Sequence, residues 1–320
     1  MRQGCKTDED VEGLRPLVPG LLLSLLACAG FAAGAPAVQP PLPMPPPMPP
    51  PTAADRVLVV SPHPDDESLC CAGLLQQALA AGAAVGIVWI TDGDGFEIDA
   101  IIAEHTLRPQ GAALRRLGSL RLREAHAAAD LLGVPRRFQY VLGYPDRDIR
   151  ALLGPNRHLP LRSTYTRVSA VATAEARSPG AAYTGENLAR DLGAVLDDFA
   201  PTLVLAAAPQ DLHSDHAASG QLTAELLAAR GHAASLRWWI VHAGRHWPAP
   251  RSYHPALPLT APPTAPSLDW HALAIDAAQN ERKRAAIAAH KTQTEVMKPF
   301  LMAFVRRNEL FAVPPGPQGR

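Results

Sequence analysis

Hydrophobic positions along this chain form short apolar runs that alternate with stretches of helical spacing. The apolar runs predict buried strands at 57–60, 84–90, 139–142, 202–208 and 236–242. Helical spacing predicts helices at about 67–82, 115–132, 186–199, 217–230 and 278–291. This alternation predicts an α/β fold, a Rossmann-like, doubly wound and mostly parallel sheet with right-handed crossovers. In such a sheet, ligands bind at the carboxyl ends of the strands.

An acidic cluster follows the first predicted strand, in Ser-Pro-His-Pro-Asp-Asp-Glu at 61–67. Its two prolines stop the strand and delay the next helix. Three adjacent carboxylates repel one another unless a cation lies among them. His63 and Asp66 are donors of the kind that binds zinc, which leaves Asp65 free to act as a base. The alternative is a capped turn, with an aspartate as N-cap and Glu67 in the first helical turn.

A second cluster follows the predicted strand at 202–208, in Pro-Gln-Asp-Leu-His-Ser-Asp-His. One imidazole of His213 and His216 can complete a His/Asp/His metal site with an open position. The other can remain unligated as a general acid or oxyanion donor. Asp215 can orient an imidazole through its carboxylate. Histidines at a helix start are common on surfaces, but two complementary clusters at strand ends favour a metal site.

These motifs resemble the PIG-L/LmbE-like family of zinc-dependent N-acetylglucosamine deacetylases. His63-Pro-Asp-Asp-Glu67 is similar to the family's H-P-D-D-E, and His213-x-Asp-His216 to its H-x-D-H. Smaller similarities follow in the family's order at Thr91-Asp-Gly93, Arg123-Glu124, Tyr144-Pro-Asp146 and His290-Lys-Thr-Gln293. The resemblance covers residues 55–300, except that 147–185 match no family segment.

The resemblance implies one Zn²⁺ ion, or another divalent metal, held by His63, Asp66 and His216. It implies three catalytic residues: Asp65 as the base that deprotonates the attacking water, His213 as the group that stabilises the tetrahedral intermediate or protonates the leaving amine, and Asp215 as support for His213. It also implies that Arg123 and Asp146 contact the sugar.

The expected reaction is hydrolysis of an acyl amide, most simply an N-acetyl group, on an N-acetylglucosamine-type sugar or glycoconjugate. Some members of the family place a tyrosine before the histidine motif, where this chain has residues 210–212, so oxyanion stabilisation falls more on His213 and the metal. The alternative is a catalytically weak, metal-bearing carbohydrate-binding module of the same fold. A metallo-phosphoesterase would need further ligands for a second metal.

Charge and cysteine content narrow the classes of protein to which this chain can belong. The 30 Lys and Arg residues balance the 30 Asp and Glu residues, so no basic field for nucleic acid is present. The four cysteines show no CxxC spacing and predict no disulfide framework. Cys70 and Cys71 are adjacent on a predicted helix, where neighbours face apart, and are expected to be small buried hydrophobic residues.

The chain is expected to divide into an export signal or membrane anchor at 1–34, a proline-rich linker at 35–54, the deacetylase domain at 55–310 and a flexible tail at 311–320. The apolar run at 17–34 is short for a bilayer span and ends in small residues, which favours an exported protein. Simple cleavage is favoured over lipidation at Cys28, and tethering to a membrane through this segment is the alternative.

Overall fold

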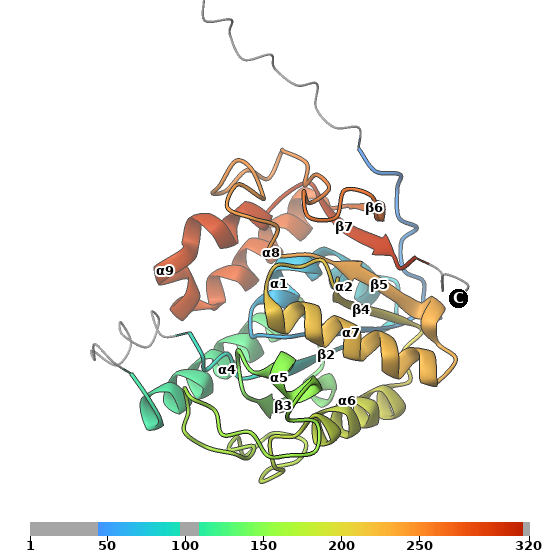
Figure 1. The fold of residues 1–320 in the computed structure, drawn as a ribbon. Helices are drawn as coiled ribbons and strands as arrows, with labels where there is room; N and C mark the ends of the chain where they lie inside the picture. Colours follow the sequence, from blue (N-terminus) through green and yellow to red (C-terminus); the bar gives the residue numbers. More distant parts are fainter. Residues whose placement is uncertain (1–43, 97–108, 316–320) are drawn as a thin grey trace, which may run out of the picture. The chain divides into compact units, whose positions relative to one another are not determined.

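The computed structural model describes residues 44–96 and 109–315, all within one compact unit, Leu42–Arg320. Seven strands form one sheet in the order β3-β2-β1-β4-β5-β7-β6 (Figure 1). They are β1 (Arg56–Ser61), β2 (Ala84–Thr91), β3 (Gln139–Tyr144), β4 (Leu203–Ala207), β5 (Leu236–Trp239), β6 (Asp269–Ala274) and β7 (Asn308–Val313). The first five are parallel, and β7 runs antiparallel to both β5 and β6. The predicted fold class is confirmed.

Helices cover both faces of the sheet (Figure 1). They are α1 (Asp66–Cys70), α2 (Ala72–Ala80), α4 (Ala112–Leu132), α5 (Ile149–Leu153), α6 (Gly185–Phe199), α7 (Ser214–Ala229), α8 (Ala277–Ala289) and α9 (Lys291–Leu301). Short 3₁₀ helices lie at Arg136–Phe138, Ala233–Ser235 and Met302–Phe304. Helix α8 packs on α2 and α4, whereas α5 and α6 pack against α7. Within the described ranges, no helix combines the length and apolar character needed to cross a membrane.

The strand order reverses between β1 and β4. From β1 the chain proceeds through β2 to β3 on one side, and β4 then returns to the other side of β1. The two strands pair in parallel register, Val57 with Leu203 and Val59 with Leu205. Their carboxyl ends therefore lie side by side at a topological switch point, where open α/β sheets bind ligands.

The helix predicted over 67–82 is interrupted at Cys71, whose φ of −134° and ψ of 0° are not helical. A disulfide joins Cys70 to Cys71. The expectation of two unpaired cysteines is therefore wrong, because it assumed a continuous helix in which neighbouring side chains diverge.

Both ends of the domain extend further than expected. In the expected linker, Met48 N donates to Ala272 O at 2.9 Å and Ala272 N donates to Pro46 O at 2.8 Å, so this stretch lies along β6. At the other end, β7 continues to Val313 with Phe311 buried, so the tail does not begin at 311. The expected export segment at 1–34 and residues 316–320 lie outside the described residues.

A buried ion pair ties the C-terminal elements to the helix that carries the acidic motif. Lys283 Nζ on α8 lies 2.8 Å from Glu309 Oε1 on β7, and both side chains are 0% exposed. Glu309 also accepts hydrogen bonds from the backbone N–H groups of Gly73 and Leu74, at 2.8 and 2.9 Å. Lys283 donates to Leu69 O at 2.8 Å. These bonds satisfy both buried charges and fix α1 and α2 against β7.

Candidate metal centre

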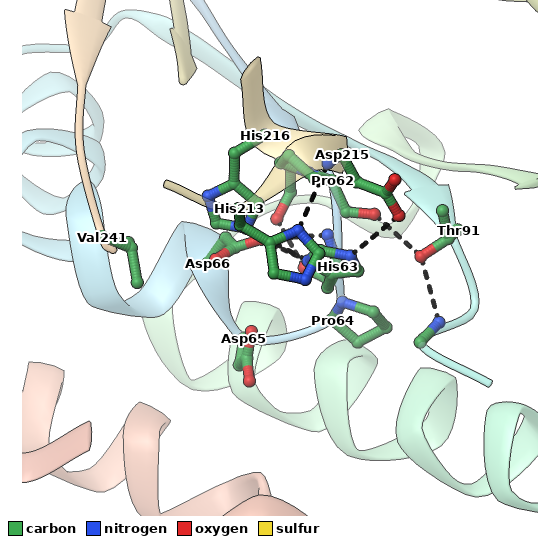
Figure 2. Close-up of polar contacts among 12 residues, drawn as sticks. Pro62, His63, Pro64, Asp65, Asp66, Thr91, His213, Asp215, His216 and Val241 are labelled. Atoms are coloured by element: carbon green, nitrogen blue, oxygen red, sulfur yellow. Dashed lines mark hydrogen bonds and ion pairs between the residues drawn. The ribbon is translucent and has the colours of Figure 1, made fainter. Parts of the chain in front are cut away.

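Three side-chain atoms from the two strand-end clusters converge at the switch point. His63 Nδ1 lies 3.1 Å from His216 Nε2 and 3.3 Å from Asp66 Oδ2, and His216 Nε2 lies 3.2 Å from Asp66 Oδ2. Figure 2 shows these groups together, with Asp65 apart from them. All three residues are buried. Two imidazole nitrogens and one carboxylate oxygen at these separations have the composition and spacing of a tetrahedral zinc site with an open position.

The loop after β1 is held by bonds to its own ends and to β2. Thr91 donates to Pro62 O from both its backbone N and its Oγ1, at 3.1 and 2.9 Å (Figure 2). His63 N donates to Asp66 Oδ2 at 2.9 Å, which brings the two candidate ligands together. Asp65 precedes α1 with a φ of 141°, but its side chain makes no capping hydrogen bond. A capped turn therefore does not account for Asp65.

Glu67, the third acid of the cluster, is buried and holds the loop through its own hydrogen bonds. Its carboxylate accepts hydrogen bonds from Trp89 Nε1 at 2.9 Å and from Ser68 Oγ at 2.8 Å. His290 Nε2, at the end of α8, lies 3.2 Å from Glu67 Oε1. His290 is 1% exposed, so it supports the loop and does not line the cavity.

Each candidate ligand histidine faces a carboxylate with its second ring nitrogen. His63 Nε2 lies 3.1 Å from Asp146 Oδ1 and 3.5 Å from Asp215 Oδ2, and His216 Nδ1 lies 3.2 Å from Asp211 Oδ2. Metal-binding histidines are held in this way, because the carboxylate fixes the ring's orientation and its tautomer. The arrangement behind the two rings therefore fits a metal site.

Asp211 was missed by the sequence analysis, which treated 210–212 only as a departure from the family pattern. Its carboxylate accepts hydrogen bonds from the N–H groups of Val241 and His242 at 2.8 and 3.0 Å, and from His213 N at 2.9 Å. Burial opposes its charged form, but His216 outweighs this and lowers the pKa of Asp211 to about 2. An acid in the loop after a strand, five residues before a candidate ligand, was the available signal.

The carboxylate of Asp215 does not lie where it was expected. It accepts hydrogen bonds from Arg147 N at 2.6 Å and Ile149 N at 3.3 Å, and it faces His63 (Figure 2). The hydrogen bond between Asp215 and the His213 ring comes from the backbone of Asp215, whose N–H donates to His213 Nδ1 at 3.3 Å. Because Nδ1 accepts this bond, the ring proton of neutral His213 lies on Nε2.

Asp65 lies beside the candidate metal ligands without joining them. Burial and the neighbouring Asp66 raise the pKa of Asp65 to about 7. Arg121 Nη2 lies 3.5 Å from Asp65 Oδ2, and the same guanidinium donates to Gly93 O at 2.6 Å. Arg121 is 4% exposed, so it is held firmly at the wall of the site.

Arg123, predicted to contact the sugar, does not reach this site. It is exposed and lines a different cavity with Asp92 and Glu175. Residues two positions apart on a helix point to nearly opposite sides, so Arg121 occupies the place expected for Arg123. Glu124 shares a face with Arg121 and accepts a hydrogen bond from Thr292 Oγ1 at 2.7 Å. The i, i+3 spacing of Arg121 and Glu124 was the signal that could have separated the two arginines.

A cavity of about 210 Å³ has two of the three converging residues, His63 and Asp66, in its wall, whereas His216 lies behind them and is fully buried. Its polar side carries His63, Asp65, Asp66, Arg121, Asp146 and His213. Its apolar side carries Leu69, Phe96, Val241, Met297, Phe300 and Leu301. Asp146 lines this cavity and also contacts His63, and its contact with the sugar stays a prediction. The cavity thus has polar side chains next to the candidate metal ligands and an apolar wall that suits a small apolar group of a ligand.

A family model described as PIG-L, GlcNAc-PI de-N-acetylase, matches residues 58–227, more than half of the 320-residue chain. The chain belongs to the PIG-L family. A 1D-myo-inositol 2-acetamido-2-deoxy-alpha-D-glucopyranoside deacetylase from Nakamurella multipartita is 30% identical over 285 residues, 79% of this chain and 84% of that protein. The predicted family is confirmed.

Two further proteins are similar to this chain. A probable N-acetyl-alpha-D-glucosaminyl L-malate deacetylase 2 from Bacillus anthracis is 27% identical over 54% of this chain and 59% of that protein. The crystal structure of the A40926 pseudoaglycone deacetylase Dbv21 has a TM-score of 0.51 at 19% identity, covering 81% of this chain and 96% of that one. This likeness concerns the fold.

Proposed function

We propose that this PIG-L protein is a zinc-dependent deacetylase that hydrolyses the N-acetyl amide of an N-acetylglucosamine-type sugar or glycoconjugate. The observation that carries the proposal is the triangle of His63 Nδ1, Asp66 Oδ2 and His216 Nε2, with edges of 3.1–3.3 Å. Asp65 lies beside this triangle and is not part of it. The family's relatives named above are deacetylases of amino-sugar conjugates, which supports the same reaction class for this chain.

His63, Asp66 and His216 would hold the metal. Bound zinc would supply a Lewis acid for the amide carbonyl and would lower the pKa of the attacking water toward about 7. The open side of the triangle faces the cavity, so substrate and water can reach it. Two histidines and one carboxylate suit zinc better than magnesium or calcium, which prefer oxygen ligands alone.

Asp65 takes the proton from the attacking water. Its carboxylate lines the cavity and is not needed as a ligand. Arg121 beside it limits the directions in which the carboxylate can turn. His213 presents Nε2–H to the cavity, and we assign this donor to the nitrogen of the leaving amine. Asp146 and Arg121 are the polar groups available to the sugar hydroxyls.

The decisive experiment measures acetate release and metal content together. Protein loaded with zinc should release acetate from at least one simple N-acetylglucosaminide. Removal of the metal with a chelator should stop the reaction, and zinc should restore it. Elemental analysis should find about one zinc per chain, as one His/Asp/His site requires. Fully zinc-loaded protein that releases no acetate from any N-acetylated amino sugar would contradict the proposal.

Export of the protein remains a separate proposal, supported by the apolar run at 17–34 that ends in small residues. N-terminal sequencing of the mature protein should find a new amino terminus close to the end of that run. An intact Met1 in the soluble fraction of the cell interior would contradict it.

A further inference from the structure

A second cavity, of about 400 Å³, adjoins the metal cavity. The two share His213, His242, Met297 and Phe300 in their walls. The second also has Leu212, Gly244 and Arg251 in its wall, and we call it the outer groove. Because the shared residues include His213, the outer groove begins where the proposed reaction places the leaving amine.

A series of stacked groups forms one wall of the outer groove. The ring centroid of His213 lies 5.3 Å from that of His242, which lies 5.7 Å from that of Phe300. Arg251 Cζ lies 4.5 Å from the Phe300 ring centroid, in cation–π contact. Arg251 lies in the segment between β5 and β6. The wall thus leads from the reaction centre across an aromatic face to a guanidinium.

The charge of Arg251 is uncompensated. Its Nη2 donates to Arg245 O at 2.8 Å, and its Nη1 is shielded from solvent without any acceptor. No acidic side chain contacts it within residues 44–96 and 109–315. By contrast, Arg177 and Arg230 pair with aspartates. A partly buried guanidinium without an acidic partner at the end of a groove is suited to an anionic group such as a carboxylate or phosphate.

We propose that the outer groove is the aglycone subsite, and that Arg251 selects substrates whose aglycone carries a carboxylate or phosphate group. This inference rests on the proposed function. The amine in the proposed reaction is attached to the sugar carbon next to the anomeric centre, so an aglycone lies near His213 and can enter the groove. The acetyl methyl group lies instead against Leu69, Val241 and Leu301, which line the metal cavity but not the outer groove.

Three aryl N-acetyl-α-D-glucosaminides test the subsite, with a carboxylate, a phosphonate or a neutral carboxamide at the para position. The aryl ring spans the apolar wall, and only the terminal charge differs. Wild-type protein should show a kcat/KM about 10–100 times higher for an anionic probe than for the carboxamide, the usual gain from a charge-assisted hydrogen bond. The preferred anion identifies which of the two the groove fits.

In Arg251→Gln the ratio of kcat/KM between the anionic and neutral probes should fall to near one, chiefly through KM. Arg245→Gln is the matched control, since Arg245 is exposed on the same loop and its side chain lines neither cavity. It should retain the wild-type ratio. Equal kcat/KM for the three probes in wild type, or an anionic preference that survives in Arg251→Gln, would overturn the proposal.

Two further results separate this inference from its alternatives. An N-succinyl probe carries its carboxylate on the acyl group, not on the aglycone. If wild type prefers this probe to an N-acetyl probe with the same neutral aglycone, and Arg251→Gln loses the preference, the acyl group lies in the groove and the assignment is overturned. If none of these aryl probes releases acetate, the proposed function is decided separately with the other N-acetylated amino sugars, and the subsite is judged by calorimetry. Tighter binding of an anionic than of the neutral probe, lost in Arg251→Gln, would still support it, and equal binding would refute it.

Discussion

The parallel half of the sheet and its antiparallel edge contribute to the site in different ways. The loop after β1 and the start of α7 supply all three candidate metal ligands, with Asp65 and His213. The elements from β6 onward supply supports and walls: His290 beneath Glu67, Lys283 paired with Glu309, and Phe300 facing the cavity. Reactive groups therefore come from two short motifs, and the first of them is also supported by a residue more than 200 positions away, His290.

The largest effect is expected from the ligands themselves. Asp66→Ala and His216→Ala should each lose bound zinc and all measurable deacetylation, because two remaining donors hold the metal too weakly. His63→Ala should behave alike. Elemental analysis after gel filtration checks the metal, and circular dichroism checks the fold. Full zinc occupancy in any one variant would remove that residue from the ligand set.

Asp65→Asn should keep the zinc and lower kcat by about 10²–10⁴-fold, the usual contribution of a positioned general base. Single-turnover acetate release, with metal content measured on the same sample, separates base from ligand. Wild-type turnover in Asp65→Asn would refute the mechanism while leaving the metal site intact. Zinc loss in Asp65→Asn with retention in Asp66→Asn would mean that the two aspartates have exchanged roles.

On the antiparallel edge, Lys283→Met should reduce the free energy of unfolding by about 3–5 kcal/mol, because it leaves Glu309 buried without its cation. Urea unfolding of the zinc-free protein measures this. Arg284→Met is the matched control on the same helix, since it removes only an exposed pair with Glu281. Equal stability of the two variants would show that the edge is not anchored by this pair.

The smallest effect concerns the carboxylate behind His216. Asp211→Asn should weaken zinc affinity by about 10–100-fold, because the ring loses a charged partner but keeps its coordinating nitrogen. Competition with a chromophoric chelator measures the affinity. Asp197→Asn, which alters an exposed acid paired with Arg230, serves as the control. Unchanged affinity in Asp211→Asn would mean that the motif residues alone position the ligands.

Much of this architecture follows from local patterns. The alternation of apolar runs and helical spacing predicts the five parallel strands, because a strand buried on both faces is apolar over its whole length. It did not reveal β6 and β7, whose short segments gain their partners by pairing with each other, with β5 and with the stretch at 46–48. The interruption at Cys71 was also hidden, since propensity alone continues the helix.

The sequence by itself supplied the residue types of the site and the fact that both clusters follow strands, and it predicted that Asp65 acts separately from the metal ligands. These facts lie within motifs of a few residues, where backbone geometry leaves little choice. Only the tertiary structure decided that Arg121 and not Arg123 faces Asp65, that Asp215 lies behind His63, and that Asp211 holds His216. Such choices depend on which helix face is buried and on contacts between distant segments, and no local spacing encodes them.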